Sequence, residues 1–160
     1  MNAVSLRAER AVVDYLTAAD WSGSGAGVPT CLTSYSHGLF TDPDEQDTMP
    51  NFPRLVVSTN SARPIQRTDL TCELEIAIEL QLSADDTDEA DVLTTVQVLD
   101  NRILPLFDDA GASALDAPSN DASGPFTAQF AAPLDFGAAS ISNRSRTFTR
   151  TFTLFCSATL

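Results

Sequence analysis

The sequence contains no lysine. All nine of its basic residues are arginine, against 22 acidic residues, which gives a formal net charge of −13 over 160 residues. Phosphate groups are bound by clustered cations, so a surface with this charge balance repels nucleic acid and anionic lipid from most directions. The composition therefore argues against a DNA-reading domain.

The acidic residues are mostly aspartate, with 16 Asp among the 22. An Asp-rich, lysine-free composition is typical of proteins from salt-loving organisms and their viruses. A GC-rich genome, which replaces Lys with Arg, explains the same composition equally well. The host therefore stays open at this point.

Histidine and cysteine are also scarce. His37 is the single histidine, and the three cysteines, Cys31, Cys72 and Cys156, show no CxxC spacing. A zinc site of ordinary ligands cannot be assembled within one chain from this set, and no base lies near a cysteine in the sequence for nucleophilic catalysis. We expect no catalytic, metal or cofactor site, and buried free thiols at Cys72 and Cys156. The sequence thus favours a protein that is not an enzyme.

Long apolar runs are missing too. No stretch approaches the roughly 18 residues that a transmembrane helix needs, and the N-terminus lacks a basic start followed by an apolar segment. We expect neither an anchor nor a signal peptide. The length of 160 residues and the 43% hydrophobic content are those of a single domain over 1–160 with a workable core.

The most regular stretch is 70–82, where apolar and polar residues alternate. Period two over this length predicts a half-buried β-strand of roughly 40 Å. Its apolar face consists of Leu70, Cys72, Leu74, Ile76, Ile78, Leu80 and Leu82. The other face carries Glu73, Glu75 and Glu79, which we interpret as a solvated or interface stripe because all three are like charges on a polar face.

Three further strands are predicted around this one. Residues 54–59 are β-branched and are expected to pair with 70–82 as a hairpin after a turn at 60–67. Arg54, Arg63 and Arg67 are expected to gather near this turn, and we favour their pairing with Asp69 or with the glutamates of 70–82 over phosphate binding. A short strand is plausible at 29–36.

The C-terminal stretch 146–160 alternates again, with threonines on one face and apolar residues on the other. We expect it beside 70–82 in the middle of the sheet. Arg150 interrupts its apolar face, so it is expected near an edge or opposite a carboxylate.

Two amphipathic helices are predicted, at 2–20 and 86–104. In the first, Arg7, Glu9, Arg10 and Asp14 take the side opposite the apolar stripe, and in the second Pro105 ends the helix. The glycine-rich stretch at 21–27 is interpreted as a turn, because no strand precedes it and no Lys follows, as a phosphate-binding loop requires. The second helix should lie back across the Leu/Ile face, beside the first.

Two long loops remain. The segment 37–53 holds four carboxylates and two phenylalanines, and it is interpreted as a solvated acidic loop in preference to a cation site because it lacks the spacing of a calcium loop. The segment 108–143 either tucks its phenylalanines onto its own domain or reaches a neighbouring subunit as an arm. The residues concerned are Asp42, Asp44, Glu45, Asp47, Phe40 and Phe52 in the first loop, and Phe126, Phe130 and Phe136 in the second.

Together these elements predict an α+β fold, with a single antiparallel four- to five-stranded sheet, two helices packed on one face, and long loops. This plan, in a chain of this length, resembles the tail terminator (tail completion) proteins of long-tailed phages and tailed viruses. The resemblance covers most of the chain except 37–53 and 108–143. It is carried by the patterns LRAERAVVDYL, ELEIAI, ADVLTTVQVL and TFTRTFTL.

The resemblance implies a homohexameric ring in the virion that is assembled in the host cytoplasm, caps the tail tube, ends its polymerisation and presents a surface to the neck proteins. Its partners would be other copies of itself, the tube protein, a neck protein, and DNA that passes through without specific binding. The acidic groups named above, on the stripe or in loop 37–53, would line the lumen, and the phenylalanines would supply subunit contacts. The alternatives are another neck or head–tail connector subunit, and a monomeric adaptor or ligand-binding domain.

Overall fold

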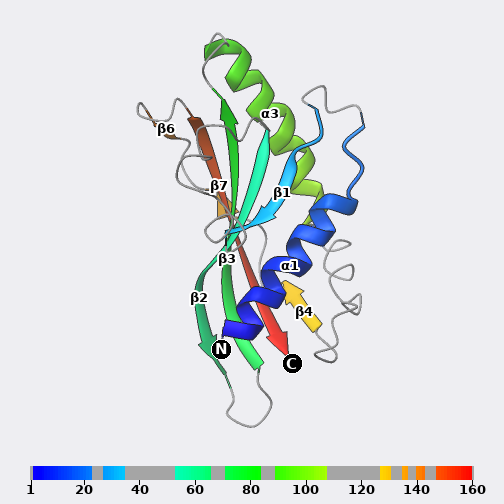
Figure 1. The fold of residues 1–160 in the computed structure, drawn as a ribbon, viewed down its shortest axis with the longest axis vertical. Helices are drawn as coiled ribbons and strands as arrows, with labels where there is room; N and C mark the ends of the chain where they lie inside the picture. Colours follow the sequence, from blue (N-terminus) through cyan, green and yellow to red (C-terminus); the bar gives the residue numbers. More distant parts are fainter. Residues whose placement is uncertain are drawn as a thin grey trace, which may run out of the picture.

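The computed structural model describes residues 2–22, 27–34, 53–65, 71–83, 89–107, 127–130, 135–136, 140–142 and 147–159. These form two helices and one sheet, which confirms the α+β class (Figure 1). The elements in chain order are α1 (Asn2–Ala18), β1 (Thr30–Thr33), β2 (Arg54–Pro64), β3 (Thr71–Ser83), α3 (Glu89–Leu106), β4 (Thr127–Phe130), β5 (Asp135–Phe136), β6 (Ser140–Ser142) and β7 (Thr147–Thr159).

The strand order is β1-β2-β3-β7, and the short strands β4, β5 and β6 pair in turn with the outer edge of β7. The sheet is thus five strands wide, within the predicted four to five. One pair departs from the prediction, since β1 runs parallel to β2 and the sheet is mixed. A parallel pair requires a connection of about a dozen residues or more, and the long 34–53 segment supplies it.

The two longest strands, β3 and β7, lie side by side in the middle of the sheet, as predicted. They pair antiparallel along their whole length, from Thr71 opposite Thr159 to Ser83 opposite Thr147. Because the pairing is in register, Ile78 stands opposite Phe152 on the same face. The apolar residues of both strands therefore line one surface.

The hairpin of β2 and β3 is confirmed, but its turn comes later than expected. β2 continues to Pro64, and the register shifts between Thr59 and Ser61, where the strand is bulged. The buried side chain of Glu9 accepts a hydrogen bond from the Thr59 amide at 2.8 Å. The prediction that Arg7 and Glu9 lie on an exposed side of the first helix is wrong, because both are 7% exposed and Glu9 satisfies a backbone amide at the bulge.

Both helices lie on the same side of the sheet, as predicted, and they approach each other at their C-terminal ends (Figure 1). The Tyr15 hydroxyl donates to the Leu106 carbonyl, and the Tyr15 ring meets Phe107 edge-on with centroids 5.5 Å apart. Trp21 packs the end of α1 and donates its indole N–H to the Leu16 carbonyl at 2.9 Å. Pro105 lies inside the last turn of α3 and does not end it, a correction to the prediction.

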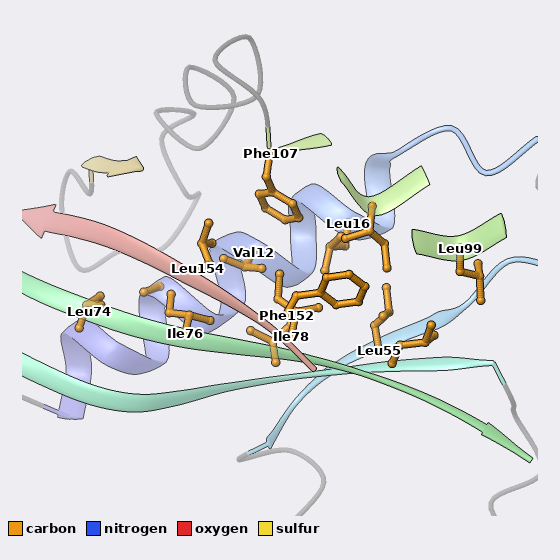
Figure 2. Close-up of a cluster of buried hydrophobic side chains, with 14 of the residues drawn as sticks. Val12, Leu16, Leu55, Leu74, Ile76, Ile78, Leu99, Phe107, Phe152 and Leu154 are labelled. Atoms are coloured by element: carbon orange, nitrogen blue, oxygen red, sulfur yellow. The ribbon is translucent and has the colours of Figure 1, made fainter. Parts of the chain in front are cut away.

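The core fills the space between the helices and the apolar face of the sheet (Figure 2). It draws on α1, α3 and the three long strands, and Phe107 joins it from beyond the predicted end of α3. Its largest fully buried side chains are Phe152, Leu16, Leu55, Leu74, Ile76, Ile78, Leu80, Leu99, Ile103 and Leu154. This arrangement leaves the other face of the sheet to a different set of residues.

A single ion pair crosses from the sheet to α3 in the described residues. Arg150, which stands opposite Leu80 on the apolar face, places Nη2 at 3.0 Å from Oδ2 of Asp100. The expectation that Arg150 meets a carboxylate is therefore confirmed. Burial raises the pKa of Asp100, and the nearby Arg150 only partly opposes this effect.

Cys31 and Cys72 are free thiols, and Cys72 is buried, as predicted. Burial raises the pKa of Cys31 to about 11, so this thiol is protonated at neutral pH. The side chain of Cys156 lies outside the described residues. No helix in the described parts of the chain has the length and apolarity needed to cross a membrane.

Two phenylalanines of β7 on opposite faces of the sheet test the placement of the core. Phe152 is fully buried and Phe155 is 38% exposed. Phe152→Ala should lower the free energy of unfolding by about 3–5 kcal/mol, because it leaves a cavity in the core. Phe155→Ala, the matched control, should cost about 1 kcal/mol or less in the same urea titration. Equal losses would contradict the assignment of the two faces.

The Asp100–Arg150 pair makes a prediction about pH. A carboxyl whose folded pKa is raised binds its proton more tightly in the folded state, so its ionisation destabilises the fold as pH rises. The stability of the wild type relative to Asp100→Asn should therefore fall between about pH 3 and 6, measured by denaturation at each pH. Asp14→Asn on the exposed side of α1 controls for the loss of one carboxylate. A difference that grows with pH would show that attraction to Arg150 outweighs burial.

Candidate interaction surface

The side of β2, β3 and β7 that faces away from both helices is called the open face here. Period-two alternation in each strand sends the residues between the core positions to this side. The cross-strand register then brings them into rows. Its described side chains are Arg54, Val56, Ser58, Asn60 at the bulge, Ser61, Arg63, Glu73, Glu75, Ala77, Glu79, Gln81, Thr149, Thr151, Thr153 and Phe155.

A polar row occupies one end of the open face. The Arg54 Nε–H donates to Oε1 of Gln81 at 2.5 Å, and Nε2 of Gln81 donates to Oε1 of Glu79 at 2.6 Å. Burial lowers the pKa of Arg54, and the charge of Glu79 partly opposes this. Gln81 thus links a cation to a carboxylate, and Glu79 is not an isolated negative charge.

The other two glutamates also have polar neighbours. Oε1 of Glu75 accepts a hydrogen bond from Nδ2 of Asn60 at 3.4 Å, and Glu73 stands opposite Arg63 in the β2–β3 register. The structure therefore places the predicted stripe of Glu73, Glu75 and Glu79 on one face as expected. It also places arginine, glutamine and asparagine beside these carboxylates, which reduces their net negative field.

Apolar and small side chains fill the centre of the open face. Ala77 stands between Ser58 and Thr153 in register and is 6% exposed, and Val56 is 8% exposed. Phe155 remains 38% exposed. Since an exposed aromatic ring next to hydrogen-bonded polar groups is typical of protein interfaces, the open face is chemically suited to protein contact.

The structure describes some of the remaining predicted interface residues and not others. Phe130 lies in β4 opposite Cys156, and Phe136 lies in β5 opposite Phe152, so both belong to segments that pair with the chain's own β7. These paired segments follow their own sheet and are not part of an arm that reaches a neighbour. Loop residues Asp42, Asp44, Glu45, Asp47, Phe40 and Phe52, together with Phe126, lie outside the described residues.

The predicted cluster of arginines near the hairpin turn is wrong for Arg54, whereas Arg63 lies at the turn end of β2. Arg54 and Arg63 lie at opposite ends of β2, because that strand runs on through the expected turn. Arg67 and Asp69 lie outside the described residues. The predicted association of an arginine with the glutamate stripe holds for Arg54, which is linked to Glu79 through Gln81. The sequence did not indicate that Gln81 forms this link; its only signal was the alternation that places Glu79 and Gln81 on one side of β3.

No three His, Cys, Asp or Glu side chains form a metal-binding group within the parts of the chain that the structure describes.

Comparison with known proteins gives no match of two kinds: no protein-family model matches the sequence, and no curated protein matches it.

The polar row can be tested through its central residue. Gln81→Ala removes the group that both accepts from Arg54 and donates to Glu79, and we expect it to lower the free energy of unfolding by about 1 kcal/mol. Gln97→Ala, on the exposed side of α3, is the matched control and should leave stability nearly unchanged. Identical urea midpoints for the two variants would contradict a stabilising role for the row.

Proposed function

We propose that this protein is a structural subunit that assembles with copies of itself into a closed ring, of the kind that caps a viral tail tube. In this role it ends polymerisation of the tube and offers a surface to the neck of the virion. The proposal extends the resemblance to tail terminator proteins, which rests on the order and length of the helices and strands.

The observation that carries the proposal is the one-sided cover of the sheet. Both described helices pack on one face, while the open face combines hydrogen-bonded polar groups with the exposed ring of Phe155. A subunit of a ring needs two different contact patches, because each copy touches two neighbours in the same rotational sense. A sheet face that neither described helix covers, with this composition, supplies one such patch.

The net charge of −13 suits a channel for DNA, since a negative wall does not retain phosphate. Two sets of carboxylates are candidates for the lumen: the glutamates of the open face and the acidic residues of loop 37–53. The polar partners of Glu75 and Glu79 favour the open face as a subunit contact. We therefore propose, as the remaining candidates for the lumen, Asp42, Asp44, Glu45 and Asp47 of the loop, which lie outside the described residues.

The decisive measurement is mass in solution. The 17.1 kDa chain should form a discrete oligomer by light scattering or native mass spectrometry, alone or with tube protein, and should appear as rings the width of a tail tube in negative stain. When added to polymerising tube protein, it should stop growth at substoichiometric amounts. A chain that stays monomeric under all these conditions would favour an adaptor domain, and a ring that binds connector but not tube would favour a neck protein.

A further inference from the structure

We propose that the open face receives the outer side of α3 from a second copy of the chain, so that the subunit contact runs from the helix side of one molecule to the sheet side of the next. This inference rests on the proposed ring and names the surfaces that form it. It follows from three features of the described residues: charge, exposed apolar groups, and the positions of the two surfaces.

The first feature is a patch without exposed negative charge. The outer side of α3, here called the α3 patch, consists of the exposed residues Leu93, Thr94, Gln97, Asn101, Arg102 and Pro105. Asp100 is the single acidic residue between 93 and 107, and it is turned inward to Arg150 and 14% exposed. In a chain with a net charge of −13, like copies repel each other over most directions of approach. The α3 patch itself adds no exposed carboxylate to this repulsion, and the other acidic residues of α3, Glu89 and Asp91, lie in the first turn of the helix.

The charges of the two surfaces are complementary. Arg102 is the one charged residue of the α3 patch, whereas the open face carries three glutamates against Arg54 and Arg63. Contact between the two would therefore bring a cation toward a surface of slight negative charge. Contact between two open faces would instead bring glutamates together, which disfavours a symmetric pairing.

The second feature is a pair of exposed apolar side chains. Leu93 on the α3 patch is 51% exposed, and Phe155 on the open face is 38% exposed. Each is a large apolar group in an otherwise polar setting, which is the pattern of an interface anchor inside a polar rim. One surface thus offers an apolar side chain to the other.

The third feature is geometric. The α3 patch lies on the helix side of the molecule and the open face lies on the opposite side of the sheet (Figure 1). A contact between them leaves one surface of each kind free at the two ends of the assembly, so subunits can continue to add in one direction. Such a contact forms a ring when the rotation between neighbouring copies closes, and a filament when it does not. A single contact of this type therefore explains assembly beyond a dimer.

Two substitutions test the contact. Leu93→Glu places a negative charge on the α3 patch, and Phe155→Arg removes the apolar group of the open face and sets a cation opposite Arg102. Each variant alone should remain at the 17.1 kDa monomer mass at concentrations where the wild type is assembled. Val28→Glu, at a position that is 72% exposed and outside both surfaces, is the matched control and should assemble like the wild type.

Mixing the two variants gives the sharper result. Leu93→Glu keeps an intact open face and Phe155→Arg keeps an intact α3 patch, so an equimolar mixture has one intact contact and should associate at least to a dimer. Growth beyond the dimer would show that the two altered surfaces, which carry introduced charges of opposite sign, also meet. Far-UV circular dichroism confirms that each variant is folded. A mixture that stays monomeric, or a Leu93→Glu variant that assembles like Val28→Glu, overturns the assignment while leaving the ring itself intact. A wild type that never assembles, alone or on tube protein, overturns both.

Discussion

The long central strand β3 is the element on which the rest of the structure depends, because it pairs over its length with β2 on one side and β7 on the other. These two ladders align the apolar residues of three strands, and a slip of one residue in either would turn an entire apolar set toward solvent. The helices can cover the sheet only because this register holds. The same register determines which residues reach the open face.

Two polar contacts between the helices and the sheet complete this arrangement. Glu9 accepts from the Thr59 amide where β2 is bulged, and Asp100 meets Arg150 between α3 and β7. Partly buried ion pairs such as this one add little net stability, because desolvation opposes attraction, and the raised pKa of Asp100 has this cause. Their value lies in geometry, since a charged pair favours one placement of a helix over neighbouring ones that would leave a buried charge unpaired.

The open face and the α3 patch show how a strongly acidic chain can associate with itself. Repulsion between copies is large when net charge is far from zero, so contact is favoured where carboxylates are absent or have polar partners. On the open face, Gln81 and Asn60 donate to Glu79 and Glu75. On α3, Asp100 is the single acidic residue between 93 and 107, and its side chain is directed inward to Arg150. In the proposed ring, the remaining acidic surface would keep the subunits in solution and would not retain DNA.

The sequence alone determined the helices, the long strands and the two faces of β3, because period-two and helical patterns depend on local chain geometry. It also predicted that Arg150 would meet a carboxylate, since a cation on an apolar face needs a partner. It did not determine the parallel pairing of β1, the bulge at Asn60, the burial of Arg7 and Glu9, or the continuation of α3 through Pro105. Each of these features depends on a partner that is distant in the chain. The parallel pairing of β1 depends on β2, and the burial of Glu9 depends on the Thr59 amide. The end of α3 depends on the contacts that Tyr15 makes with Leu106 and Phe107. Only the tertiary structure brings such partners together, and so only it revealed that Asn60 and Gln81 donate hydrogen bonds to the glutamates of the open face.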